Sequence, residues 1–166
     1  MRNLVWGFQG FVLLFVLLCG GSCKKESGCG YSYQNTVAPL SEQQAVYNYL
    51  SSYSISAAKD SSGFYYEVVD GGTGSNPTLC SQIEVTYTGK LANGNTFAGE
   101  STAFTLGSSI EGLKKGIPLI KKGGHIKLYI PPTLAYGSTD FKDKDGNVVI
   151  PANSMLIFDI TLTTFY

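Results

Sequence analysis

Few side chains in this sequence have the type and spacing needed for covalent or metal chemistry. The one histidine, His125, directly follows two glycines and opens an apolar run, and no paired nucleophile stands out, so a solvated strand residue is favoured over a general base. The segment Asp143–Asn147 is similar to part of a calcium loop. Its first and twelfth ligand positions would be Phe141 and Ala152, however, so the twelve-residue pattern fails. We interpret it as a turn at a loop tip, with a loosely bound cation as the alternative.

Composition narrows the function classes further. The 166 residues include twelve Lys and Arg against twelve Asp and Glu, so no basic excess is present to bind nucleic acid through its phosphates. Charged residues make up 14% and aromatic residues 13%, which excludes a disordered charged tail and indicates a real hydrophobic core. The four cysteines have no paired metal spacing across the folded part. The sequence therefore predicts neither a metal site nor nucleic-acid binding.

The strongest functional signal is a series of ordered motifs between residues 85 and 159. In chain order they are Val85-Thr-Tyr-Thr-Gly89, Leu91-Ala-Asn-Gly-Asn-Thr-Phe97, Phe104-Thr-Leu-Gly107, Ile110-Glu-Gly112, Lys122-Gly-Gly124, Ile130-Pro-Pro-Thr-Leu-Ala-Tyr-Gly137 and Ile150-Pro-Ala-Asn-Ser-Met-Leu-Ile-Phe-Asp159. Together they resemble the FKBP family of peptidyl-prolyl cis–trans isomerases. The resemblance covers about residues 63–166.

This resemblance implies an enzyme that speeds rotation about X–Pro bonds without acid, base, metal or cofactor. It places four aromatic residues in a catalytic pocket: Tyr87, Phe97, Tyr136 and Phe158. It also implies four substrate-binding residues, Ile110, Leu113, Val149 and Ile150. In this assignment the Tyr136 hydroxyl and the Ile110 N–H bind the substrate backbone, and Val149 and Ile150 close one rim. The alternative reading makes the aromatic residues ordinary core, and for Phe158 both readings stay open.

The sequence departs from the family pattern at several pocket positions. Ala98 stands where the family usually has an aspartate, and Leu113 stands where it has a tryptophan at the pocket floor. Thr102 falls near another aromatic position. The segment 138–149 is also longer than in compact members and could cover the pocket, with Phe141 as its covering residue. These changes bear on catalytic rate and on affinity for rapamycin-type macrolides more than on fold.

Hydrophobic periodicity predicts the elements that position these residues. Strands are expected at 64–69, 83–88, 96–97, 104–106, 125–130 and 155–160, with a hairpin turn at Asn93-Gly94. Leu113, Ile117 and Ile120 share one face of a short helix that contains Pro118. The pattern indicates an α+β domain. The resemblance further implies a strongly bent antiparallel sheet wrapped around one short central helix and preceded by an N-terminal helix.

The first residues are typical of an export signal. Arg2 is the only charge before Lys24, and the apolar run 4–18 is shorter than the roughly 20 residues of a bilayer span. Small residues followed abruptly by charge resemble a bacterial lipoprotein cleavage site, so 1–22 is predicted to be a signal peptide and Cys23 the lipidated residue. Cys19 is the rival lipidation site. An uncleaved anchor helix is the alternative to cleavage.

Residues 23–62 are predicted to be a tether followed by a helix at Ser41–Ser56. The stretch 26–39 has no helical or strand period and indicates a tether, and Ser41–Gln44 matches a capping box. The helix would pack on the main domain or pair with a second chain. Residues 63–166 form the predicted isomerase domain. Cys29 and Cys80 could form a disulfide, since export leads to an oxidising compartment, or could remain two free thiols.

The sequence thus predicts a lipid-anchored isomerase of the bacterial cell envelope, at the outer membrane with a periplasmic or surface face. Its expected partners are proline-containing unfolded or nascent exported proteins, the membrane through its lipid, and rapamycin-type macrolides. Two hypotheses from other functional classes rank below this one. One is a peptide-binding or chaperone module of low activity, suggested by Ala98 and Leu113. The other is a structural surface lipoprotein whose tyrosines bind glycan or protein, and a filled core would favour it.

Overall fold

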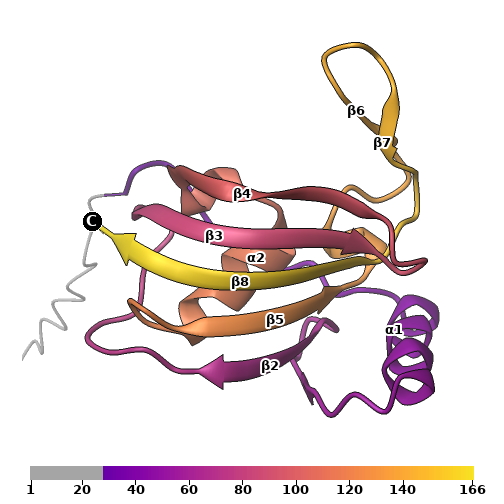
Figure 1. Cartoon of the computed structure of the whole chain (residues 1–166), viewed down its shortest axis with the longest axis horizontal. Coiled ribbons are helices and arrows are strands. Elements are labelled where there is room, and N and C mark those ends of the chain that lie inside the picture. Colours follow the sequence, from indigo (N-terminus) through magenta and orange to yellow (C-terminus); the bar gives the residue numbers. More distant parts are fainter. Residues whose placement is uncertain (1–27) are drawn as a thin grey trace, which may run out of the picture.

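A curved antiparallel sheet packed against a short helix forms the body of the protein (Figure 1). The computed structural model describes residues 28–166. Every neighbouring strand pair in the main sheet is antiparallel. In sheet order the strands are β1 (Ala58–Lys59), β2 (Tyr65–Asp70), β5 (His125–Ile130), β8 (Leu156–Phe165), β3 (Gln82–Leu91) and β4 (Thr96–Thr105). The predicted α+β class, with an antiparallel sheet around a central helix and a helix before it, is confirmed.

Alternation along the strands places the core on one face of this sheet. In β8 the buried positions are every second residue from Leu156 to Leu162, and the residues between them are more exposed. The turn between β3 and β4 contains Gly94 at a φ of 90°, the left-handed conformation that the predicted hairpin required. The strand predicted at 96–97 and the first two residues of the one predicted at 104–106 are parts of one ten-residue strand, β4, whereas Leu106 begins a 3₁₀ turn.

The central helix α2 (Glu111–Gly116) is short because Pro118 follows it. A 3₁₀ turn, Ile117–Leu119, continues the chain in its place, and Ile117 is completely buried. Two helix glycines allow α2 to approach β5 closely. A Cβ at Gly112 would lie 2.5 Å from Ile130 Cγ2, and one at Gly116 would lie 2.6 Å from Leu128 Cδ1. Both contacted side chains are fully buried, so neither can move aside easily.

The N-terminal helix α1 (Leu40–Ser52) packs on the sheet. This is the first of the two predicted alternatives, packing on the main domain instead of pairing with a second chain. Val46 and Leu50 are buried against Tyr65 and Tyr129. The predicted capping box is wrong, because Pro39 is the N-cap residue and no side chain caps the helix. The helix also ends four residues before the predicted Ser56, and Ser54, at a φ of 54°, has left the helical conformation.

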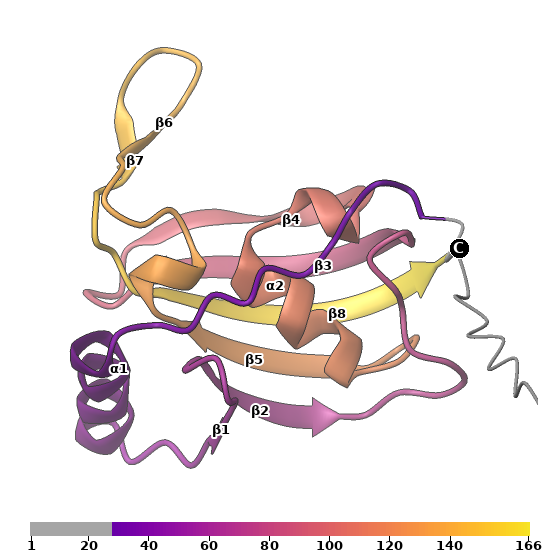
Figure 2. The ribbon, with the colours of Figure 1, turned by 180° about the vertical axis from the view of Figure 1, so that it is seen from behind.

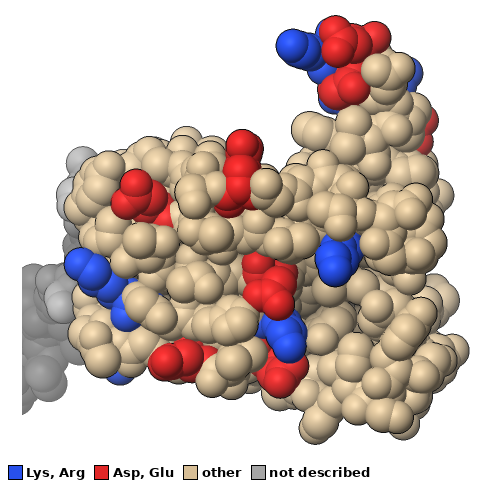
Figure 3. Space-filling view, in the orientation of Figure 1, with Lys and Arg blue, Asp and Glu red and all other residues tan. Residues whose placement is uncertain are grey.

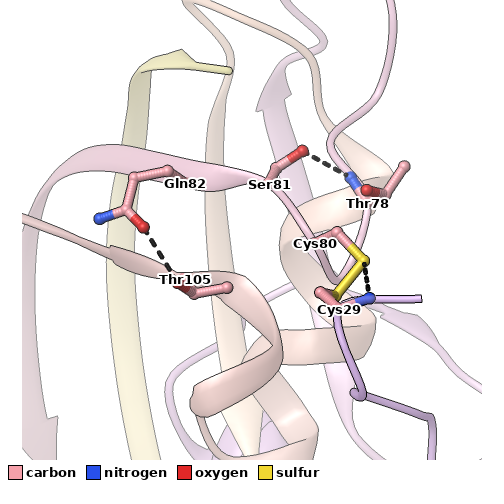
Figure 4. Close-up of a disulfide and its surroundings, with 6 residues drawn as sticks. All are labelled: Cys29, Thr78, Cys80, Ser81, Gln82 and Thr105. Carbon is pink, nitrogen blue, oxygen red and sulfur yellow. Dashed lines mark hydrogen bonds between the residues drawn. A yellow bond between two sulfur atoms is a disulfide. The ribbon is translucent and has the colours of Figure 1, made fainter. Parts of the chain in front are cut away.

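Residues 29–38, which we call the N-terminal strap, lie along the outside of α2 (Figure 2). A disulfide joins Cys29 to Cys80, with their Cα atoms 5.5 Å apart (Figure 4). At the other end Ala38 is buried, and its N–H donates to the Ser62 carbonyl. The segment that the sequence indicated as a tether is thus held against the domain over these residues. Its aperiodic sequence reflects a segment held by scattered contacts instead of by regular hydrogen bonding.

A second, two-stranded sheet projects from the body as a hairpin of β6 (Phe141–Lys142) and β7 (Val148–Ile150) (Figure 1). At its tip the Asp143 carboxylate accepts hydrogen bonds from the backbone N–H groups of Asp145 and Asn147 and from the Asn147 side chain. The side-chain bond from Asn147 is the main reason why the pKa of Asp143 is lowered. These bonds support a closed turn.

Some of the predicted features lie outside residues 28–166. The signal peptide 1–22 and the lipidation candidates Cys19 and Cys23 lie outside the described residues. From residue 28 onward, no three His, Cys, Asp or Glu side chains gather where they could hold a metal ion. In the same part of the chain, no helix has the length and apolar character to cross a bilayer.

The close approach of α2 to β5 predicts a specific glycine requirement. We expect Gly112→Ala to lower the free energy of unfolding by about 1–2 kcal/mol, because overpacking against Ile130 outweighs the roughly 1 kcal/mol that alanine adds to helix propensity. Gly71→Ala is the matched control, since a Cβ there meets nothing within 4 Å and the backbone φ is ordinary. Urea unfolding measures both variants. Equal stabilities would show that α2 can shift freely on the sheet.

Candidate active site

A largely apolar cavity of about 380 Å³ opens between the sheet and the segment that leads into α2. All eight pocket residues predicted from the sequence line it, and strands β3, β4 and β8 supply one wall. The full lining is Val85, Tyr87, Phe97, Ala98, Phe104, Ser108, Ser109, Ile110, Leu113, Ile117, Tyr136, Phe141, Val149, Ile150, Phe158 and Ile160. A volume of this size accommodates a small organic ligand or a few atoms of peptide around one side chain.

Aromatic rings that contact one another hold one wall of the cavity in place. The Phe158 ring lies 5.6 Å from the Phe97 ring in an edge-to-face arrangement and 6.1 Å from the Tyr87 ring. Such ring pairs favour fixed relative orientations. Phe97 can reach this position because Gly89, opposite on β3, has no side chain: a Cβ there would lie 2.5 Å from the Phe97 ring. The rings therefore support each other around an open space instead of filling it.

Few polar groups of the lining are free to bind a ligand. The hydroxyls of Ser108 and Ser109 each donate 2.7 Å hydrogen bonds to nearby backbone carbonyls. Across residues 28–166, by contrast, no hydrogen bond within the protein involves the hydroxyls of Tyr87 and Tyr136 or the backbone N–H of Ile110. Since no fully buried side-chain polar atom lacks a partner there, the two hydroxyls are not completely enclosed. Three hydrogen-bond donors are therefore available in a hollow whose remaining surface is mainly apolar.

Burial keeps both phenols protonated beyond their ordinary range. The pKa of Tyr136 is raised above 10.0 mainly by burial and further by the nearby Tyr87. The pKa of Tyr87 is raised by burial and then by the negative charge of Glu100. Both groups therefore remain hydrogen-bond donors at neutral pH. They are the only titratable side chains in the lining.

Some lining residues were not assigned from the sequence. Phe104, Val85 and Ile160 belong to the inward face of strands whose alternation was recognised, but periodicity cannot separate cavity wall from core. Phe141 was predicted as a cover. Its ring lies 4.8 Å from the Tyr136 ring and is 43% exposed. The tip of the hairpin projects from the body of the protein (Figure 1), and of its two strands only Phe141, Val149 and Ile150 line the cavity, so the expected cover is limited to the base of the hairpin.

Charged side chains lie mainly away from the cavity. His125 contacts Asp159, and neither residue belongs to the lining. Figure 3 shows positive and negative groups mixed on the viewed face, with wide uncharged areas between them and no continuous field of one sign. This distribution leaves the aromatic cavity as the strongest candidate for a site.

Comparison with known proteins identifies the family. A family model described as FKBP-type peptidyl-prolyl cis–trans isomerase matches residues 74–163. This chain therefore belongs to the FKBP-type peptidyl-prolyl isomerase family. The crystal structure of FkpA from Escherichia coli is similar with a TM-score of 0.64 at 34% identity, covering 76% of this chain and 60% of that one. A peptidyl-prolyl isomerase structure from Pseudomonas syringae is similar with a TM-score of 0.63 at 25% identity. The match covers 78% of this chain and 98% of that one.

Curated sequences show the same relationship. FkpA of Escherichia coli K12 is 43% identical over 107 residues, which are 61% of this chain and 37% of that relative. A probable FKBP-type isomerase of Haemophilus influenzae is 38% identical over 104 residues, which are 60% and 41% of the two chains. The chain thus spans well under half the length of these two curated relatives.

The raised phenol pKa values predict how ligand binding depends on pH. Affinity for a proline-containing peptide should be constant from about pH 6 to 9, because no lining group titrates there, and should fall above about pH 10 as the tyrosines lose their protons. Fluorescence anisotropy of a labelled peptide measures this, with circular dichroism to confirm folding at each pH. A transition near neutral pH in the folded protein would mean that another group controls the site.

Proposed function

We propose that this chain is an active peptidyl-prolyl cis–trans isomerase and that the aromatic cavity is its catalytic site. The observation that carries the proposal is the combination of an open, ring-walled hollow with three unpartnered hydrogen-bond donors. The open cavity argues against a purely structural lipoprotein, for which a filled core was expected. Membership of the isomerase family supports the same activity.

The proposed reaction requires no proton transfer or covalent intermediate. Amide resonance opposes rotation about an X–Pro bond with a barrier of about 18–20 kcal/mol. The planar ground state carries a strongly polarised carbonyl, and this polarisation falls as the bond twists. An apolar cavity therefore destabilises the planar form relative to the twisted transition state, which is differential binding. Lowering the barrier by about 4 kcal/mol would accelerate rotation about a thousandfold.

Each proposed residue acts through binding and shape. The rings of Tyr87, Phe97 and Phe158 surround the proline. The Tyr136 hydroxyl donates to a substrate carbonyl, and the Ile110 N–H holds the adjoining peptide. Leu113 forms an apolar floor, and Val149 and Ile150 close one rim. Ala98 and Leu113 both line the cavity and leave it less polar and less bulky than the family pattern, so rapamycin-type macrolides should bind more weakly than to members that keep that pattern.

A hydroxyl deletion tests the proposed role of Tyr136. Tyr136→Phe should lower kcat/KM for a proline peptide about tenfold, as expected for a lost hydrogen bond worth about 1.4 kcal/mol in the transition state. Tyr47→Phe is the matched control, because Tyr47 is exposed on α1 outside the cavity. Peptide binding by the folded, unmodified chain without acceleration of isomerisation would replace the enzyme with the peptide-binding module as the function.

We further propose that residues 63–166 act as an isomerase domain on a lipid-anchored, exported protein whose clients are proline-containing unfolded or nascent exported proteins. The disulfide between Cys29 and Cys80 supports export, because such bonds persist in oxidising compartments. The apolar run before Cys23, with small residues directly before that cysteine, supports lipidation. Cleavage before Cys23 would leave the chain from Cys23 onward anchored to the envelope, at the outer membrane in this proposal.

Cysteine replacement tests the anchor. When the full gene is expressed in a bacterium fed radioactive palmitate, Cys23→Ser should abolish labelling and release the protein from the membrane fraction. Cys19→Ser is the matched control and should retain both properties. Loss of labelling with Cys19→Ser alone would move the site to Cys19. Unlabelled protein that is membrane-bound in all variants would favour an uncleaved anchor helix.

A further inference from the structure

The N-terminal strap contacts the domain on either side of a cavity-lining segment. Its first part lies near the end of β4, where the Cys29–Cys80 disulfide sits close to Thr78 (Figure 4). Its last part leads into α1 (Figure 2). Between these ends it passes residues 107–115, which contain four of the cavity-lining residues, Ser108, Ser109, Ile110 and Leu113. We call the first three, which are consecutive, the rim.

Tyr31 makes the first contact, just before the rim. Its ring packs directly on Gly107, which is buried and has no side chain, and any Cβ at this position would collide with the ring. The disulfide two residues earlier fixes the start of the strap to the loop that precedes β3. Because the Gly107 N–H donates to the Leu79 carbonyl one residue from Cys80, the strap, this loop and the start of the rim form one connected unit.

Glu111 makes the second contact, just after the rim. Its Oε2 accepts a 3.2 Å hydrogen bond from the Gln34 backbone N–H, and its Oε1 contacts Lys114 Nζ at 2.8 Å. The Glu111 and Lys114 side chains are only 13% and 15% exposed, so both are largely fixed. Lys115 adds a 3.3 Å bond from Nζ to the Thr36 carbonyl. The strap is therefore attached to the first turn and to the last turn of α2.

Among the described residues, the hydrogen bonds of the rim itself are all local. The Ser108 and Ser109 hydroxyls and the Ser109 N–H bond to carbonyls of residues 105 and 106, and the Ile110 carbonyl accepts from Leu113 and Lys114. These bonds fix the shape of the rim, and the Ile110 side chain also packs against the hydrophobic core. No strand pairs with the rim in the part of the chain that the structure describes. The flanking contacts with the strap add a further restraint from outside.

We propose that the N-terminal strap positions the rim of the isomerase site, with Tyr31 and Glu111 as positioning residues. The substrate group that depends on them is the peptide held by the Ile110 N–H, so this inference rests on the proposed function. Neither Tyr31 nor Glu111 lines the cavity, and both act through residues 107–111. Releasing the strap should weaken binding of the peptide that flanks the proline, while the ring-walled part of the site stays intact.

Hydrogen–deuterium exchange of the full chain tests this directly and independently of catalysis. We expect Tyr31→Ala and the double variant Cys29→Ser/Cys80→Ser to raise exchange of the amides in 108–113 about tenfold or more, while β8 and β3 keep their protection. Tyr33→Ala is the matched control: Tyr33 is two residues further along the same strap and similarly exposed, at 49% against 42% for Tyr31. It should leave 108–113 unchanged.

Steady-state kinetics then separates positioning from general stability. Tyr31→Ala and Glu111→Ala should raise KM about three- to tenfold with kcat within about twofold, because substrate binding is weakened and the transition-state cavity is retained. Glu111→Gln keeps an acceptor for the Gln34 N–H and should restore KM toward the original value. Lys114→Met, which removes only the ion pair with Glu111, should resemble the unmodified chain.

The two failures are distinguishable. The amides of residues 108–113 could exchange at the same rate in Tyr31→Ala, in the double cysteine variant and in the control Tyr33→Ala. In that case the strap does not position the rim, whatever isomerase activity these variants have. An equal loss of kcat in Tyr31→Ala and Tyr33→Ala, or a loss in Glu111→Ala that Glu111→Gln does not reverse, would also overturn the proposal. Absence of isomerisation in the unmodified, folded chain would overturn the proposed function, and the exchange result would still decide whether the strap orders the rim.

Discussion

The structure depends on an apolar hollow that stays open inside a well-packed domain. Protein interiors normally close such spaces, because side chains gain contacts by filling them. Here the Phe158 ring is held between Phe97 and Tyr87, and Gly89 leaves room for Phe97, so the wall residues gain their contacts from one another. On the opposite side, Gly112 and Gly116 fix α2 against β5. The hollow lies where the helix segment and the sheet diverge.

Much of this arrangement could be predicted from the sequence, for two different reasons. Alternation along β3 and β8 predicted these strands, because one face of each is buried and the other is more exposed. Alternation is incomplete in β5, where Tyr129 is also buried, against α1. The cavity residues were predicted by the order of family motifs, since Tyr87 and Tyr136 are 49 positions apart and no local pattern relates them. Phe104 shows the limit of periodicity. The alternation of the strand identifies Phe104 as an inward-facing residue but does not show that it borders an open space.

The strap shows why the remaining features could not be predicted. Its bonds join residues far apart in sequence, such as Gln34 and Glu111 at a separation of 77. Such contacts leave no periodic signal, so a Ser-, Gly- and Tyr-rich segment is typical of a tether even when it is bound. The capping box failed for a different reason. The helix begins earlier than expected, with Pro39 as its N-cap residue, so Ser41 already lies in the first turn and not at the N-cap position.

The most direct test of the central claim is exchange NMR of a short proline peptide mixed with the full chain. The account predicts that the rate of cis–trans exchange rises in proportion to the amount of protein, and that proline ring protons show nuclear Overhauser contacts to the aromatic protons of Tyr87 and Phe158. An unchanged exchange rate with a folded protein, or proline contacts to residues outside the cavity, would contradict the account.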